Sequence, residues 1–245
     1  MKWVAIEIQS VLEPDKKGIR KVPGVRIANS ATGESLYTPP EGETLIRDLL
    51  KNLEDYYNDV VDSNIDTLIK TAVCHYQFES IHPFLDGNGR VGRILMVLQL
   101  ILAQRLQTPI LFLSGFINQN RADYYRLLME VTSKNNWKEW ILYILTAIEE
   151  QSKETTSTVL DIKDLMTKYR EDVRKALPKI YSADMIEFLF SYPFYNQKNM
   201  VDDLGVTRKT ASGYFSHLEK NGFITSMKIG RDVIYFNKNL IGLLK

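Results

Sequence analysis

Cysteine is nearly absent from this sequence, since Cys74 is the only one among 245 residues. A single cysteine excludes a disulfide framework and any zinc cluster built from several cysteines. A surplus of charge of one sign is lacking as well, because 31 basic and 30 acidic side chains leave a formal net charge of +1. The surface as a whole therefore does not attract nucleic acid or anionic membrane, and binding of that kind must come from a local patch.

Long apolar runs are also missing. The longest, Ile94 to Ala103, is interrupted by Gln99 and falls well short of the roughly 20 residues that span a bilayer. The apolar stretch after Met1-Lys2-Trp3 is too short and too soon charged for a signal-peptide core. We therefore expect a cytoplasmic protein with no membrane partner. Because 44% of the residues are hydrophobic, a chain of this length predicts one or two domains that each bury a core.

The hydrophobic pattern predicts a mainly α protein with one small hairpin near its start. Two short β-favouring stretches, Val25-Arg26-Ile27 and Leu36-Tyr37-Thr38, flank a glycine-containing loop, which predicts a hairpin near residues 20–40. From Glu43 onward, apolar residues recur every three or four positions, which predicts a series of amphipathic helices. The stretch from Arg90 to Leu106 is apolar nearly all round, so we expect a buried helix at the centre of a bundle.

The C-terminal part has a different character. A polar patch within a long helical stretch predicts a helical connector over residues 151–180. Beyond it, three short helical segments are followed by two β-favouring runs, Phe223-Ile224 and Val233 to Phe236. Gly205 lies between the second and third of these helices, where a helix-turn-helix needs a tight turn. This order predicts a winged helix-turn-helix domain over residues 181–245.

Residues that carry chemistry are concentrated in residues 82–93, which read HPFLDGNGRVGR. Pro83 ends the helix before it, and the glycines on either side of Asn88 favour a loop that joins two helices. Because the loop ends where the buried helix begins, its free N–H groups and the positive end of the helix dipole predict an anion site. Arg90 and Arg93 lie three positions apart on the first turns of that helix and add two phosphate donors.

Two other side chains of this segment are suited to catalysis. Asp86 is its only carboxylate, and a carboxylate beside phosphates commonly holds Mg²⁺, although Asp is also a frequent helix cap. His82 can take a proton near neutral pH. His75, Glu79 and His82 share one helix face and resemble half of a di-iron site, but the sequence lacks the second Glu-x-x-His that such a site requires. His75 is therefore expected to be a core residue or a support behind the site.

Residues 82–93 resemble the signature of the Fic family, H-P-F-x-D/E-G-N-G-R-x-x-R, and every fixed position is present. Three flanking stretches are similar as well: Phe78 to Ile81, Tyr37 to Pro40, and Asn120-Arg121 followed by Tyr124-Tyr125. The resemblance implies a Fic-type helical bundle over residues 1–150, in which the predicted hairpin is the element that this family calls the flap. Members of the family often carry a winged helix after the bundle.

The resemblance implies a protein adenylyltransferase, an enzyme that transfers AMP from ATP to a Tyr, Thr or Ser hydroxyl of a target protein. His82 would act as the base, and Asp86 would hold Mg²⁺. The phosphates of ATP would be held by the rest of the motif: Gly87, Asn88, Gly89, Arg90 and Arg93. Tyr124 and Tyr125 match positions that line the nucleotide base or ribose pocket, and core packing is the other interpretation of this pair. In a relative that transfers the γ-phosphate, lysine replaces the second glycine, so Gly89 favours nucleotidyl transfer.

The resemblance also bears on partners. The flap would dock the target by β-strand addition, with Leu36 and Tyr37 as its contacts. Many members restrain themselves with an inhibitory helix, in which a Ser or Thr is followed by three residues, a Glu, and a Gly or Asn. The nearest string here, Ser30 to Ser35, lacks the final Gly or Asn, and the usual helical N-terminal extension is missing. We expect either a truncated version or restraint from elsewhere, such as an inhibitory protein, and a homodimer stays open.

The rival function class is a DNA-binding regulator whose Fic domain is vestigial or has another specificity. Residues 197–245 carry eight basic and four acidic side chains. Arg208 and Lys209 open the predicted recognition helix, and Arg231 lies at the tip of the wing, where these side chains suit phosphate or groove contacts with DNA. Winged helices also serve as protein-interaction modules, and the intact His82 counts against a vestigial catalytic domain.

Overall fold

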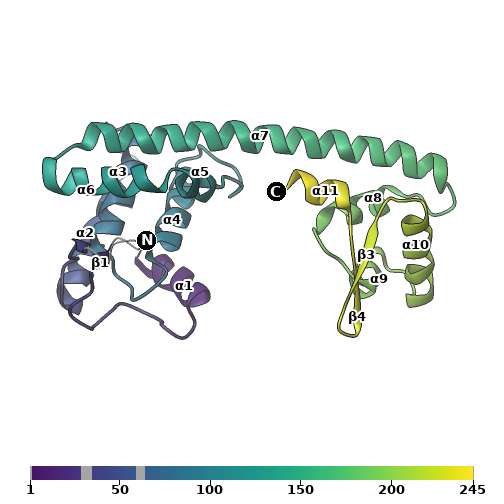
Figure 1. The fold of residues 1–245 in the computed structure, drawn as a ribbon, viewed down its shortest axis with the longest axis horizontal. Helices are drawn as coiled ribbons and strands as arrows, with labels where there is room; N and C mark the ends of the chain where they lie inside the picture. Colours follow the sequence, from purple (N-terminus) through teal and green to yellow (C-terminus); the bar gives the residue numbers. More distant parts are fainter. Residues whose placement is uncertain (1, 29–34, 59–63, 245) are drawn as a thin grey trace. The chain divides into compact units, whose positions relative to one another are not determined.

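The chain forms two compact units, Met1–Lys153 and Glu154–Lys245, in the computed structural model (Figure 1). The structure describes residues 2–28, 35–58 and 64–244. Both units are built mainly from helices, which confirms the predicted mainly α fold class. Among the described residues, no helix has both the length and the apolar composition that a bilayer span requires.

The first unit is a helical bundle with one small hairpin. Its elements in chain order are α1 (Lys2–Leu12), β1 (Ile27–Ala28), β2 (Ser35–Tyr37), α2 (Glu43–Asn58), α3 (Thr67–Ile81), α4 (Asn88–Leu102), α5 (Leu113–Gln119), α6 (Arg121–Lys134) and the first part of α7 (Trp137–Ala176). α3 begins at a cap in which the Asp66 carboxylate accepts a hydrogen bond from the Leu68 N–H. It ends at Ile81 with His82 as its C-cap, because the residue after His82, Pro83, cannot continue a helix.

The predicted hairpin is present. β1 pairs antiparallel with β2, and Ile27 lies opposite Tyr37. The backbone of Leu36, one of the two predicted docking residues, belongs to β2. The predicted loop at residues 29–33 lies outside the described residues, as does most of the string that comes nearest to an inhibitory motif.

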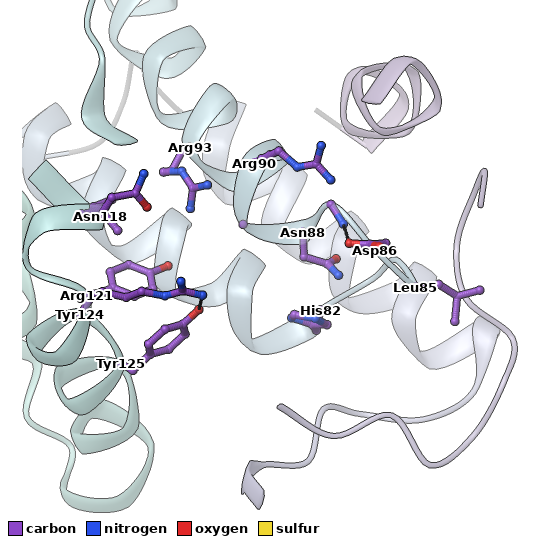
Figure 2. Close-up of a pocket in the computed structure, with 13 residues that line it drawn as sticks. His82, Leu85, Asp86, Asn88, Arg90, Arg93, Asn118, Arg121, Tyr124 and Tyr125 are labelled. Atoms are coloured by element: carbon purple, nitrogen blue, oxygen red, sulfur yellow. Dashed lines mark hydrogen bonds between the residues drawn. The ribbon is translucent and has the colours of Figure 1, made fainter. Parts of the chain in front are cut away.

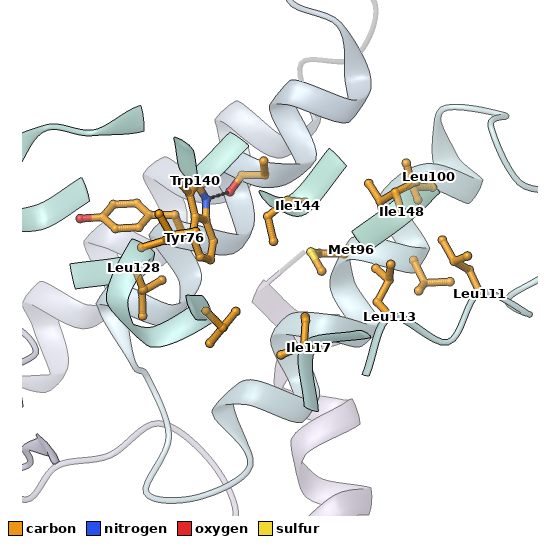
Figure 3. Packing of buried hydrophobic residues seen from close by; sticks show 14 of the residues in the cluster. Tyr76, Met96, Leu100, Leu111, Leu113, Ile117, Leu128, Trp140, Ile144 and Ile148 are labelled. Atoms are coloured by element: carbon orange, nitrogen blue, oxygen red, sulfur yellow. Dashed lines mark hydrogen bonds between the residues drawn. The ribbon is translucent and has the colours of Figure 1, made fainter. Parts of the chain in front are cut away.

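α4 is the central helix of the first unit, as its apolar sequence predicts. One face packs with α1, α2 and α3, where Val91 and Leu95 are buried. The opposite face packs with α5, α6 and α7, where Met96 and Leu100 lie in a second cluster with Trp140 (Figure 3). The Trp140 indole N–H donates to a backbone carbonyl of α3 at 2.8 Å. Because α4 is packed on both faces, the loop that leads into it is held in place.

Residues 2–12 form α1, an element that sequence analysis did not assign. Ala5 is completely buried, and Ile8 and Leu12 pack against the same core as α2 and α4. The apolar residues of this stretch recur at helical spacing, which is the signal for the helix in the sequence. After α1 the chain runs antiparallel to the motif loop, with Ile19 bridged to Phe84. The segment that follows α1 therefore lies beside the residues of the predicted site.

The second unit has the element order that a winged helix-turn-helix predicts. After the end of α7 it contains α8 (Ala183–Ser191), α9 (Gln197–Leu204), α10 (Arg208–Lys220), β3 (Thr225–Ile229), β4 (Asp232–Phe236) and α11 (Lys238–Leu243). Gly205 adopts φ +64° and makes the tight turn from α9 to α10. Tyr169 and Val173 of α7 lie in the core of this unit. The ring of Tyr235 on β4 stacks on Phe215 of α10, with centroids 4.0 Å apart.

Candidate active site

Residues 82–93 line a pocket of about 310 Å³ at the start of α4 (Figure 2). The motif forms one wall, and α5 and α6 form the other. The pocket brings together the residues that the sequence predicts for catalysis, metal binding and nucleotide binding: His82, Asp86, Gly87, Asn88, Gly89, Arg90, Arg93, Tyr124 and Tyr125. Asn118 and Arg121 also line it, although sequence analysis did not assign them to the site. The stretch around Arg121 resembles the family, whereas Asn118 has no motif signal.

His82 lies at the end of α3 in a left-handed backbone conformation, with φ +47° and ψ +59°. Its N–H bonds to the Phe78 carbonyl at 3.0 Å, which closes the last turn of the helix. The imidazole is half-buried at the pocket, and its Nδ1 has no hydrogen-bond partner among the described residues. Burial lowers the pKa of His82 to about 4, so the imidazole is neutral at pH 7 and can accept a proton.

Asn88 closes the loop between α3 and α4 and is only 3% exposed. Its side-chain amide donates to the Phe84 carbonyl at 2.8 Å, and its Oδ1 accepts from the Phe84 N–H at 2.9 Å. Gly87 precedes α4 with φ +84°, a conformation that a side chain would strain. The loop therefore presents the first turn of α4 to the pocket, where its free N–H groups and the helix dipole suit an anion.

The two arginines of the motif are held by residues from distant parts of the chain. Arg90 forms an ion pair with Glu13, which follows α1. The Arg93 Nε donates to the Ser114 Oγ at 2.8 Å. Sequence analysis did not find Glu13 or Ser114, because a contact between distant segments leaves no periodic signal along the chain. Since both arginines line the pocket, an anion there meets two guanidinium groups.

Asp86 is the only carboxylate among the described residues that line the pocket. Its Oδ2 pairs with the Lys16 Nζ at 2.6 Å, and its Oδ1 accepts from the Gly87 N–H at 2.8 Å. The bond to Lys16 lowers the pKa of Asp86, so the carboxylate is charged at neutral pH. Within the described ranges, no group of three or more His, Cys, Asp or Glu is placed to hold a metal ion. A single charged carboxylate still fits Mg²⁺, which is usually held by one or two carboxylates together with substrate phosphates.

Tyr124 lines the pocket and is also packed in the core. It is 4% exposed, its ring centroid lies 5.5 Å from that of Trp140, and its hydroxyl bonds to the His75 Nε2 at 2.9 Å. Tyr125 is half-buried beside it, and the Arg121 guanidinium lies 5.6 Å from its ring centroid. This wall presents aromatic rings and a cation across the pocket from the motif loop (Figure 2).

His75 and Glu79 lie on α3 behind the pocket, and both are buried. Burial lowers the pKa of His75 to about 3 and raises that of Glu79 to about 7. The His75 Nδ1 and the Glu79 Oε1 have no hydrogen-bond partner in the described part of the chain. Gly92 of α4 leaves the space that they occupy, since a Cβ at this position would lie 2.4 Å from the Glu79 Oε1. His75 is thus a core residue that holds Tyr124 from behind.

The other predicted site residues lie away from this pocket. Tyr37 on β2 lines a separate cavity of about 10 Å³ together with residues of α3 and α6, and burial raises its pKa. Arg208 and Lys209 are exposed at the start of α10, and Arg231 is exposed at the turn between β3 and β4. These three side chains belong to the second unit.

Comparisons with known proteins give matches to both units. Residues 5–100 match the Fic/DOC family model, and residues 165–240 match a model described as the C-terminal domain of SoFic-like protein adenylyltransferases. Protein adenylyltransferase fic-1 of Caenorhabditis elegans is 29% identical over 142 residues, which cover 57% of this chain and 26% of that protein. Protein adenylyltransferase Fic of Drosophila willistoni is 28% identical over 111 residues, covering 45% of this chain and 21% of that protein.

A solved structure gives the same fold. The crystal structure of a Fic family protein from Desulfovibrio desulfuricans aligns with a TM-score of 0.54 and 20% sequence identity, covering 96% of this chain and 68% of that one. The matched region is only 26% of the worm protein and 21% of the fly protein. What those longer proteins do as a whole is therefore a separate question from the fold that they share with this chain.

Proposed function

Because residues 5–100 match the Fic/DOC family model, we propose that this chain transfers AMP from ATP to a hydroxyl side chain of a target protein. The target oxygen bonds to the α-phosphorus while the bond between the α- and β-phosphates breaks and pyrophosphate leaves. The hydroxyl proton passes to His82. The observation that carries this proposal is that a neutral imidazole and the anion-binding start of a helix share one pocket. Relatives named protein adenylyltransferases support the same chemistry.

His82 acts as the general base because its imidazole is neutral at pH 7 and lines the pocket. The N–H groups at the start of α4 stabilise the charge that develops on the transferring phosphate. Arg90 and Arg93 orient the outer phosphates, and Arg90 exchanges its present partner, Glu13, for a phosphate when it does so. Asp86 would hold Mg²⁺ together with the phosphates, and the ion supplies neutralising charge when bound.

The wall made by α5 and α6 is suited to the nucleoside end of ATP. Tyr124 and Tyr125 offer aromatic surface there, and Asn118 offers a polar group. The β1–β2 sheet has two strands in the described part of the chain, so each strand has an edge to which an extended target segment can add. Leu36 and Tyr37 on β2 are the residues that we expect at this docking edge.

Radiolabelled ATP tests the proposal directly. The protein is incubated with Mg²⁺, a cell lysate and ATP labelled at either the α- or the γ-phosphate. We expect protein-bound label from the α-phosphate only, and loss of that label in His82→Ala because the base is missing. His217→Ala is the matched control, since His217 is an exposed histidine on α10.

The outcomes separate the reaction types. Label from the γ-phosphate would replace adenylyl transfer with phosphoryl transfer. Equal α-label in wild type and His82→Ala would remove His82 from its role as base. Absence of label from either position, in a protein that binds ATP, would contradict the proposed function.

A further inference from the structure

Arg20 is a buried arginine whose guanidinium bonds to backbone carbonyls. It is 2% exposed and follows the bridge that joins the segment after α1 to the motif loop. Its Nε donates to the His82 carbonyl at 2.7 Å, and its Nη2 donates to the Pro40 carbonyl at 2.5 Å and lies 3.4 Å from the Ile81 carbonyl. Its backbone N–H donates to the Pro83 carbonyl at 2.9 Å. One residue therefore contacts the end of α3, the start of the motif and the end of the hairpin segment.

The Ile81 carbonyl needs a donor from outside its helix. The last carbonyls of an α-helix have no partner within it, and α3 ends at Ile81. Ile81 is buried, so water does not easily replace a lost partner of its carbonyl. A guanidinium carries five N–H groups in a planar fork, and no other side chain can donate in so many directions at once. Removing the Arg20 side chain would take this donor from the carbonyls of His82, Pro40 and Ile81, of which that of Ile81 is buried.

The backbone of His82 adds a second requirement. It has φ +47°, in the left-handed region where residues other than glycine or asparagine are strained. Such strain persists only where surrounding contacts fix the conformation. The 2.7 Å bond from the Arg20 Nε to the His82 carbonyl is such a contact, because it fixes the peptide that follows the strained residue. That conformation turns the chain from α3 into the motif loop and directs the imidazole into the pocket (Figure 2).

We infer that Arg20 is a positioning residue for the transfer reaction. It fixes the backbone of His82 so that the imidazole faces the target hydroxyl. Through its bond to the Pro40 carbonyl, it also connects the hairpin segment to His82. This inference rests on the proposed function, since it takes His82 as the base. Arg20 does not line the pocket, so its effect on the reaction passes through His82 rather than through the nucleotide.

The charge of Arg20 has a further consequence. Burial lowers the pKa of His82 to about 4, and the positive charge of Arg20 acts in the same direction. Asp86 and the backbone of Glu79 act in the opposite direction. Three further charged side chains line the pocket that His82 faces: Arg90, Arg93 and Arg121. Arg20 is not among the residues that line the pocket. Replacing it therefore removes a positive charge near His82 and leaves the pocket wall unchanged.

Kinetics of three variants test the inference. In Arg20→Met we expect kcat to fall by about tenfold or more with little change in the KM for ATP, because a misplaced base slows chemistry while the phosphate cradle is intact. The acid limb of the pH profile should move to higher pH, since one cation near His82 is gone. Arg20→Lys keeps the charge and should restore the acid limb, while recovering kcat only in part. Arg47→Met, on α2, is the matched control, because Arg47 pairs only with the neighbouring Glu43 in the described structure.

Histidine NMR gives a readout that does not depend on activity. The chain has three histidines, so the signal of His82 can be assigned with His82→Ala and His217→Ala. We expect the pKa of His82 to rise in Arg20→Met and to stay near the wild-type value in Arg20→Lys and Arg47→Met. Thermal unfolding of each variant shows whether it is folded. If Arg20→Met is not folded, the kcat of Arg20→Lys alone tests the positioning role, and we expect that kcat to be below the wild-type value.

The possible results distinguish the two proposals. A folded Arg20→Met variant with wild-type kcat and an unchanged pKa of His82 would overturn the positioning role. A wild type without adenylyl transfer would overturn the proposed function, while a rise in the pKa of His82 in Arg20→Met would still support the contact between these residues.

Discussion

Gly92 on α4 lies where the packing leaves no space for a side chain. A Cβ at this position would lie 2.4 Å from the Glu79 Oε1 and 3.1 Å from two atoms of the His75 ring. Alanine is favoured over glycine inside a helix by about 1 kcal/mol. Overpacking a buried site costs about 1–3 kcal/mol, and the upper end applies because Glu79 is only 6% exposed and cannot swing into solvent. We expect Gly92→Ala to lower the free energy of unfolding by about 1–2 kcal/mol.

Urea denaturation followed by circular dichroism measures this change, since both units are built mainly from helices, and tryptophan fluorescence assigns it to the first unit, which holds Trp3, Trp137 and Trp140. Gly213→Ala on α10 is the matched control, because nothing lies within 4 Å of its added Cβ, and it should be neutral or stabilising. Glu79→Ala should remove most of the cost of Gly92→Ala in the double variant, because the clashing carboxylate is absent. An unchanged or higher unfolding midpoint in Gly92→Ala, or a double variant with simply additive losses, would refute this explanation.

Three other predictions follow from the site. Transfer activity should hold as pH falls through 6.5 and decline only as the pH approaches about 4, because His82 stays neutral until then; a pH profile with its acid limb near 6.5 would contradict the burial argument. Lys16→Ala should lower the Mg²⁺ concentration for half-maximal activity by up to about fivefold, since the ion pair that competes for Asp86 is exposed and therefore weak, whereas Lys17→Ala should leave it unchanged. Tyr124→Phe should cost about 1–2 kcal/mol in urea denaturation by leaving the buried His75 Nε2 without a partner; equal stability would show that this bond contributes nothing.

The helices and the hairpin could be predicted because their signals are local. Apolar residues at helical spacing mark α2 and α3, and an apolar sequence on all sides marks α4 as the buried centre. Gly205 marks the turn between α9 and α10 because it has the left-handed conformation that glycine adopts without strain. α1 has the same kind of signal, but residues 2–12 are a short stretch at the start of the chain, where the pattern repeats only a few times.

The pocket was predictable where the motif forms it and not where other segments complete it. The spacing within residues 82–93 places the base, the carboxylate and the arginines together because all of them lie on one loop and the helix after it. Glu13 and Arg20 come from a segment more than 60 residues earlier in the chain, and their partners follow from the packing of α1. Charge and hydrogen bonding, rather than periodicity, select these contacts, so a single sequence does not reveal them.

That early segment contains two kinds of contact with different consequences for ATP binding. Glu13 and Lys16 carry charges opposite to those of Arg90 and Asp86, so the chain itself neutralises these two side chains of the pocket. When a nucleotide binds, a phosphate would replace the carboxylate at Arg90. A divalent cation would replace the Lys16 ammonium at Asp86. Such an exchange leaves Arg90 and Asp86 paired in both states, while Glu13 and Lys16, which lose their partners, are partly exposed to solvent. Arg20 differs because its partners are backbone carbonyls and it does not line the pocket, so we expect its bonds to persist and to keep His82 in place while the surface ion pairs are replaced.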